Sequence, residues 1–141
     1  MEDIIYHYET EFTLNEADNI SLWLNASIEE EGKELGELNY IFCDDEYLLK
    51  VNIDHLNHDY YTDIITFDYC ENDIVISDLF LSIDRIKENA KTYGVLFEEE
   101  LHRVMIHGVM HLCGYKDKSE EDAEKMRERE NHYLQKLTLS N

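Results

Sequence analysis

Proline is absent from this chain of 141 residues. The sequence also lacks internal repeats, low-complexity stretches and segments with the composition of a linker. A chain of this length can bury one hydrophobic core, so we expect one domain over residues 1–141 without an internal boundary. No apolar run approaches the roughly 20 residues that a membrane-spanning helix needs, and we therefore expect no membrane partner.

Cysteine is scarce. The three cysteines, Cys43, Cys70 and Cys113, are odd in number and far apart, and none forms a C-x-x-C pair. A disulfide framework or a thiolate zinc site is therefore not expected. The first residues, Met1-Glu2-Asp3, lack the basic and apolar regions of a secretion signal. These features together favour the reducing cytoplasm.

Basic residues are few. Twelve Lys and Arg stand against 33 Asp and Glu, which gives a net charge of −21. This charge opposes general binding to phosphate backbones, and no DNA partner is expected. Residues 1–81 carry 21 acids and two bases, a net charge of −19, whereas residues 82–118 carry six of each. The second segment therefore repels a polyanion least, although the ordinary solvation of an acidic protein explains the asymmetry equally well.

The candidate metal-binding residues lie in the segment 106–117. His107 and His111 are four residues apart, so on a helix their imidazoles project from one face. Gly114 can adopt a positive φ and end the helix, which lets the chain turn back and bring Asp117 beneath the imidazoles. Two neutral nitrogens and one carboxylate oxygen suit a divalent metal with an open coordination position. We predict one divalent ion per chain, bound by His107, His111 and Asp117.

Two other classes of metalloprotein share parts of this pattern. The spacing H-x-x-x-H-x-x-G-x-x-D matches the frame of the metzincin proteases, but Gly108 occupies the position of their catalytic glutamate. The general base for peptide hydrolysis is therefore missing. Two histidines and one carboxylate also match non-haem iron oxygenases, which a ligand set on one helix and its following turn disfavours. Two helical histidines that bind no metal remain a further alternative.

The segment that begins at His107, H-G-V-M-H-L-C-G-Y-K-D, resembles the signature of the YbeY family of rRNA maturation endoribonucleases, H-G-x-x-H-L-x-G-Y-D-H. The first nine positions agree. Lys116 replaces an aspartate of the family, and Asp117 replaces its third histidine. Segments 62–67 and 73–77 are also similar to the family, but the arginine that the family carries shortly before the first of them is absent here.

The resemblance implies a metal-dependent, single-strand-specific endoribonuclease that acts in 16S rRNA 3′-end maturation and ribosome quality control. It implies zinc as the cofactor, an rRNA precursor as the substrate, and the small ribosomal subunit or an associated factor as the partner. Alternatives are another metal-dependent hydrolase, or a non-catalytic ribosome-associated factor whose metal is structural and fully coordinated. The lysines that flank Asp117, Lys116 and Lys118, are possible RNA contacts.

The pattern of apolar residues predicts an α+β (mixed α/β) fold. We expect about five helices and a mixed, mostly parallel sheet of about four strands, with the histidine helix central and buried from about residue 98 to 113. Strands are expected at residues 4–8, 38–43, 64–69 and 73–77. The expected helix-capping residues are Thr13, Asp44, Ser82 and Ser119.

Several further residues have weaker claims to a function. Asp63 precedes an expected strand and could reach the metal, although such an aspartate more often accepts hydrogen bonds in a local turn. His55 and His58 are candidate acids or bases. Tyr115 could stack on a nucleobase but more often would pack, and His102, off the ligand face, is expected at the surface.

Overall fold

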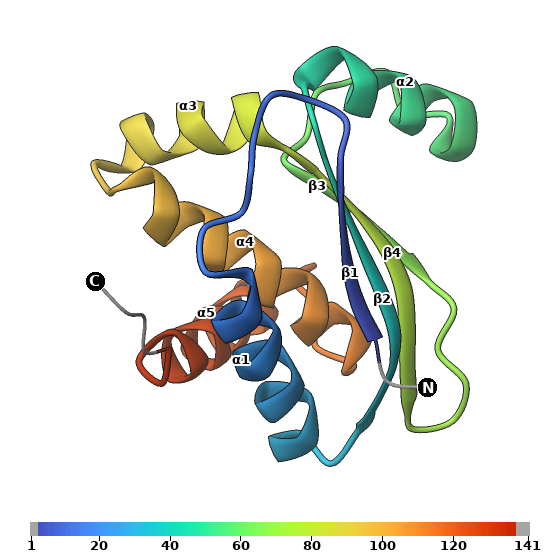
Figure 1. Ribbon diagram of the computed structural model, residues 1–141, viewed down its shortest axis with the longest axis vertical. Coiled ribbons are helices and arrows are strands. Elements are labelled where there is room, and N and C mark those ends of the chain that lie inside the picture. Colours follow the sequence, from blue (N-terminus) through green and yellow to red (C-terminus); the bar gives the residue numbers. More distant parts are fainter. Residues whose placement is uncertain (1–2, 138–141) are drawn as a thin grey trace.

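The structure is a computed structural model that describes residues 3–137 (Figure 1). The ends of the expected domain, residues 1–2 and 138–141, lie outside the described residues. Within 3–137 the strands are β1 (Asp3–Tyr8), β2 (Glu34–Cys43), β3 (Ile64–Asp68) and β4 (Ile74–Ser82), and the helices are α1 (Ala17–Glu30), α2 (Asp45–Leu56), α3 (Ile83–Tyr93), α4 (Phe97–Leu112) and α5 (Glu120–Leu134). The predicted α+β class is confirmed.

The four strands form one mixed sheet in the order β1-β2-β4-β3. Helix α1 connects β1 to β2, which pair in parallel, as a crossover connection requires. Strand β4 pairs in parallel with β2 and antiparallel with β3. The β3–β4 connection is a short turn in which Asn72 adopts a φ of 55°. The prediction of a mostly parallel mixed sheet is therefore confirmed, with the β3–β4 hairpin as its antiparallel part.

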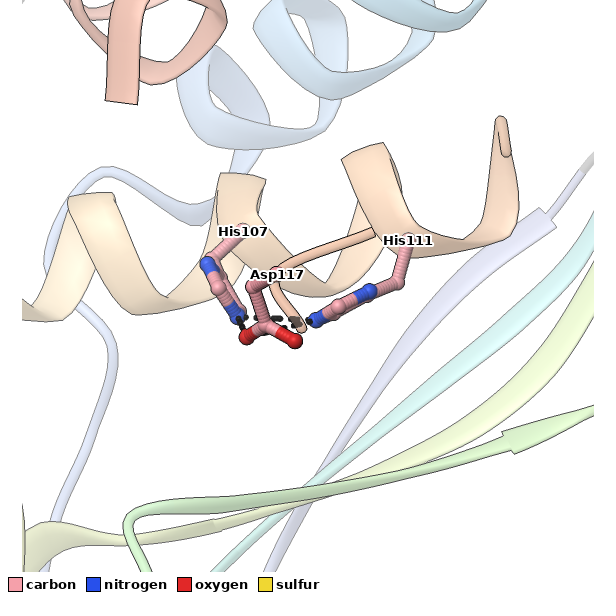
Figure 2. Close-up of side chains that lie close together, drawn as sticks. All are labelled: His107, His111 and Asp117. Atoms are coloured by element: carbon pink, nitrogen blue, oxygen red, sulfur yellow. Dashed lines mark hydrogen bonds and ion pairs between the residues drawn. The ribbon is translucent and has the colours of Figure 1, made fainter. Parts of the chain in front are cut away.

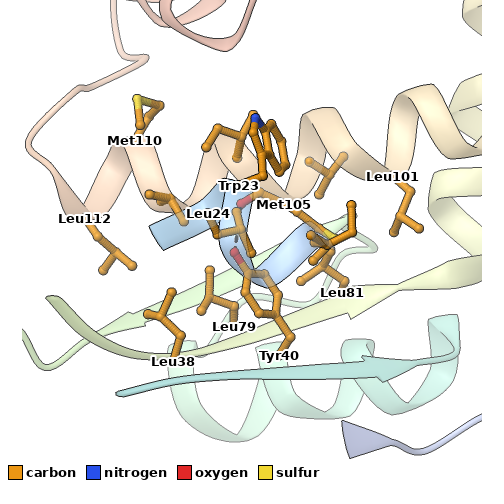
Figure 3. Packing of buried hydrophobic residues seen from close by; sticks show 14 of the residues in the cluster. Trp23, Leu24, Leu38, Tyr40, Leu79, Leu81, Leu101, Met105, Met110 and Leu112 are labelled. Carbon is orange, nitrogen blue, oxygen red and sulfur yellow. Dashed lines mark hydrogen bonds between the residues drawn. The ribbon is translucent and has the colours of Figure 1, made fainter. Parts of the chain in front are cut away.

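The main core lies between one face of the sheet and helices α1 and α4 (Figure 3). Leu38 and Tyr40 of β2 and Leu79 and Leu81 of β4 alternate along their strands, so that all four face these helices. The Tyr40 hydroxyl donates a hydrogen bond of 3.1 Å to the backbone oxygen of Met105 in α4. Helix α2 covers the opposite face with a smaller apolar cluster.

Helix α4 is central, as predicted, with ten of its 16 residues buried. Gly108 permits its close approach to the sheet. A Cβ at this position would lie 2.6 Å from Cδ2 of Leu79 and 2.9 Å from Cδ1 of Ile64. Gly108, which stands where a protease would carry its general base, therefore has a packing role here: it lets α4 lie close to Leu79 of β4 and to Ile64, the first residue of β3.

Replacing Gly108 with alanine is expected to destabilise the fold. The Leu79 side chain is fully buried and would have to shift against its packed neighbours. The overpacking cost of roughly 1–3 kcal/mol should therefore exceed the gain of about 1 kcal/mol in helix propensity. The free energy of unfolding in urea measures the effect. A second variant that combines Gly108→Ala with Leu79→Val should recover part of the loss, because the two sites are in contact. A Gly108→Ala variant as stable as wild type would contradict this account.

Helix caps are as predicted for three of the four helices in question. The side chains of Asp44, Ser82 and Ser119 accept hydrogen bonds of 2.8, 3.1 and 3.1 Å from backbone N–H groups of the first turns. The predicted Thr13 cap is wrong. Helix α1 begins only at Ala17, because Leu14 is buried and its N–H donates to the hydroxyl of Tyr8, which holds this segment against β1.

None of the helices within the described part of the chain has the length and apolar character needed to cross a membrane.

Candidate metal centre

The three predicted ligands meet at one point (Figure 2). His107 and His111 project from the same face of α4, and Asp117 lies in the turn that follows the helix. The two Nε2 atoms are 3.0 Å apart, and Oδ2 of Asp117 lies 3.6 Å from Nε2 of His107 and 3.4 Å from that of His111. The Asp117 side chain is 47% exposed, so the group is open to solvent on one side.

The turn that returns Asp117 to the helix is fixed by its backbone. Gly114 has a φ of 106°, in the region that favours glycine, as predicted. Its N–H donates to the backbone oxygen of His111, and the N–H of Tyr115 donates to that of Met110, both at 3.0 Å. These bonds satisfy carbonyls at the end of α4 and reverse the chain direction.

Hydrogen bonds that the Nδ1 atoms donate fix the tautomers of the two imidazoles. Nδ1 of His111 lies 3.0 Å from the backbone oxygen of Tyr115, which only accepts, so this nitrogen carries the proton. Nδ1 of His107 lies 2.6 Å from Oε2 of Glu130, a carboxylate that likewise accepts. In the neutral rings both Nε2 atoms then present bare lone pairs to each other at 3.0 Å. Such an arrangement is repulsive unless a proton or a metal ion lies between the two nitrogens. With the carboxylate of Asp117 beside it, the pair fits a divalent metal.

Glu130 is a part of this centre that the sequence interpretation missed. It comes from α5, is only 4% exposed, and also accepts a hydrogen bond of 2.7 Å from Arg103. Burial opposes ionisation of Glu130, but the bonds from His107 and Arg103 outweigh it and hold its pKa below the ordinary value. Burial likewise disfavours protonated His107, yet the bond and charge of Glu130 raise the pKa of this imidazole. The carboxylate therefore remains charged and orients His107.

The sequence does contain an indication that Arg103 and Glu130 support His107. Arg103 stands four residues before His107, on the same side of α4. Glu130 stands between Met126 and Tyr133 on the buried side of α5, where the other two residues are apolar or aromatic. A charged residue in an apolar stripe indicates a specific partner, because an unpaired buried charge is costly.

A cavity of about 500 Å³ opens beside the three candidate ligands. Its opposite wall comes from β3 and from the loop that follows α2, and includes Asp63 and His58. Asp63 does reach the cavity, where burial raises its pKa, but it is not among the group whose ligand atoms converge. His55 does not line this cavity, and its ring packs edge-on against Phe67.

The remaining candidates are placed as follows. Lys116 and Lys118 are exposed on either side of Asp117, and neither lines the cavity. The hydroxyl of Tyr115 donates to Glu31 at 2.8 Å, a packing role of the predicted kind. The prediction for His102 is wrong. This residue is buried, because the ring packs edge-on against Trp23 of α1, and burial lowers its pKa.

Comparison with known proteins assigns the chain to a family. The profile of the family described as Endoribonuclease YbeY matches residues 6–138. This chain belongs to the YbeY family. A YbeY endoribonuclease of Flavobacterium johnsoniae is 54% identical over 93% of this chain and 94% of its own length. The corresponding protein of Flavobacterium psychrophilum is 50% identical over the same shares.

A solved structure agrees with the family assignment. The solution structure of a Thermotoga maritima protein has a TM-score of 0.71 and 25% identity to this chain, and the match covers 94% of this chain and 88% of the other. The resemblance noted in the histidine segment therefore extends over nearly the whole chain. Within YbeY-type sequences, this member places Asp117 where the signature carries a third histidine.

Proposed function

We propose that this chain is a metal-dependent endoribonuclease that cleaves single-stranded RNA in the maturation of the 16S rRNA 3′ end. Membership of a family named for endoribonuclease activity supports the reaction class. The observation that supports a metal is the convergence of two imidazole nitrogens and one carboxylate oxygen, from His107, His111 and Asp117, within 4.8 Å of one another. We propose zinc as the ion, one per chain, and the cytoplasm as the compartment where such rRNA processing takes place.

When bound, a divalent cation supplies Lewis acidity and stabilises negative charge on a phosphoryl oxygen. The protein's contribution is to hold and aim the ligands. Glu130 and the backbone oxygen of Tyr115 keep the two imidazoles with Nε2 free. Three protein ligands leave room for substrate at the exposed side of Asp117, a geometry typical of catalytic rather than structural sites.

A cleavage assay tests this proposal. Purified protein should cleave a single-stranded RNA that spans the 16S rRNA 3′ end, lose activity on chelation, and regain it with zinc. A fully paired duplex of the same sequence is the control substrate. If the metal-loaded protein cleaves neither RNA but binds small ribosomal subunits, the non-catalytic alternative with a structural metal replaces this proposal.

The proposed partner is the small ribosomal subunit or a factor bound to it. Residues 1–81, which include β1, α1, β2 and α2, carry the net charge of −19. A basic protein surface on the partner would complement this charge, whereas free RNA would not. Cosedimentation with small subunits, compared with free 16S rRNA, tests the preference. Equal affinity for both would remove the protein partner from the proposal.

Lys116 and Lys118 are expected to contribute to RNA binding near the metal. They are exposed on either side of Asp117, and their charge offsets the anionic ligand. Each lysine that neutralises a phosphate should add roughly 0.7 to the slope of log affinity against log salt for single strands. Replacing both with glutamine should therefore reduce this slope by about 1.4 and lower cleavage, with metal content unchanged. The matched control replaces the exposed Lys50 and Lys91. If the two double variants show the same dependence of RNA affinity on salt, Lys116 and Lys118 are solvated surface residues without a role in RNA binding.

A further inference from the structure

Hydrogen bonds from α2 hold the loop between α2 and β3 at the cavity beside the proposed metal ligands. Asn57 ends α2 with a φ of 57°. Asn52 in the preceding turn is only 1% exposed. Its backbone oxygen accepts from the N–H of His58 at 3.1 Å, and its side-chain amide donates to the backbone oxygen of Tyr60 at 2.9 Å. The buried residue Asn52 therefore holds both ends of the segment 58–60, one through its backbone and the other through its side chain.

This anchored segment presents two stacked rings to solvent. The rings of His58 and Tyr60 are nearly parallel, with centroids 5.2 Å apart and an angle of 20° between their planes. The Tyr60 hydroxyl and Nδ1 of His58 also share a hydrogen bond of 3.0 Å. Tyr60 is 55% exposed although it is locked in place. The loop is thus anchored by hydrogen bonds yet leaves aromatic surface uncovered.

Both rings line the same cavity as His107, His111 and Asp117. The charge of this cavity identifies the part of a substrate that would fill it. Asp63, Asp68 and Asp117 are among its lining residues, whereas no lysine or arginine is. Away from the proposed metal, these carboxylates would repel a phosphate but not the uncharged face of a nucleobase. The volume of about 500 Å³ is in the usual range for a small-molecule site.

We propose that His58 and Tyr60 form a stacking platform for an unpaired nucleobase next to the cleaved phosphodiester. This inference rests on the proposed ribonuclease function and names the part of the RNA that the cavity receives. Stacking on an aromatic ring requires only a π-face, so the platform accepts any base but requires it to be unpaired and turned out of a helix. It therefore supplies a structural reason for preference for single-stranded RNA.

Paired variants test the platform. Tyr60→Ala should lower kcat/KM on a single-stranded oligoribonucleotide by roughly 10-fold, in line with the usual value of base–aromatic stacking. Tyr60→Phe keeps the ring and should remain close to wild type. The matched control is Tyr69→Ala, since Tyr69 is 53% exposed, stacks on Phe67 and does not line the cavity. This control should cleave like wild type.

A modified substrate separates stacking from a merely structural role of the loop. An abasic nucleotide is placed at each position around the cleavage site in turn. At one position the missing base should lower the kcat/KM of wild type about 10-fold. It should lower the kcat/KM of Tyr60→Ala almost no further, because the ring and the base act as a pair. With wild-type protein alone, 2-aminopurine at that position should lose fluorescence on binding, which keeps the test independent of any variant's stability.

The outcomes distinguish the platform from the proposed function. If wild-type protein cleaves single-stranded RNA but Tyr60→Ala matches Tyr69→Ala, and no abasic position depends on Tyr60, the platform is overturned and the ribonuclease function stands. If wild-type protein cleaves no RNA, the proposed function fails first. A Tyr60→Ala defect confined to cosedimentation with ribosomal subunits would also overturn the platform, by assigning the loop to a protein partner.

Discussion

Replacing Asp117 with alanine should remove most of the metal from the purified protein and abolish RNA cleavage. Only three protein atoms converge on the site within the described chain, and this change removes the single anionic ligand. The loss of affinity should exceed the roughly 10- to 100-fold that follows from removing a group hydrogen-bonded to a ligand. Metal content per chain, measured by mass spectrometry after gel filtration, gives the result.

Two further variants sharpen this test. Asp122→Ala also removes a carboxylate close in sequence, but its residue lies in the first turn of α5 and outside the converging group. It should keep its metal. Asp117→His restores the ligand type of the family signature and should retain metal with a stronger preference for zinc. Equal metal content in Asp117→Ala and Asp122→Ala would remove Asp117 from the site.

The local part of the centre was predictable from the sequence for a physical reason. Helix geometry alone aligns His107 with His111, and the conformational freedom of Gly114 permits the turn that brings Asp117 back. These relations span eleven residues of one continuous segment. The same holds for the capping serines and for the β3–β4 hairpin, since each depends on neighbours in sequence.

The contacts that support the ligands from other elements could not be predicted from the sequence in the same way. Glu130 reaches His107 only because α5 packs against α4, and 23 residues separate the two in sequence. The sheet order likewise depends on long-range pairing between β2 and β4. His102 was expected at the surface but is buried. Its burial against Trp23 follows from the packing of α1 on α4, which its position relative to the ligands does not indicate. Periodicity identifies a face of a helix but not the element that covers it.

The second prediction with a large effect concerns Glu130. Replacing it with alanine should weaken zinc affinity roughly 10- to 100-fold while all three proposed ligands remain in place. Without the carboxylate, Nδ1 of His107 loses the acceptor at 2.6 Å that fixes its tautomer and ring orientation. Arg103 loses an ion-pair partner at the same time, so the fold should also become less stable.

Competition against a chromophoric chelator measures the zinc affinity of each variant, and urea unfolding of the metal-free proteins measures stability separately. Glu130→Gln keeps the volume and one oxygen acceptor but removes the charge, so its zinc affinity should lie between those of wild type and Glu130→Ala. Glu128→Ala, which alters an exposed glutamate two residues away on α5, is the matched control and should bind zinc like wild type. A Glu130→Ala protein that is less stable but binds zinc with wild-type affinity would limit Glu130 to holding α5 against α4. A loss of affinity graded from glutamine to alanine would instead show that the charge and the hydrogen bond each help to orient His107 for the metal.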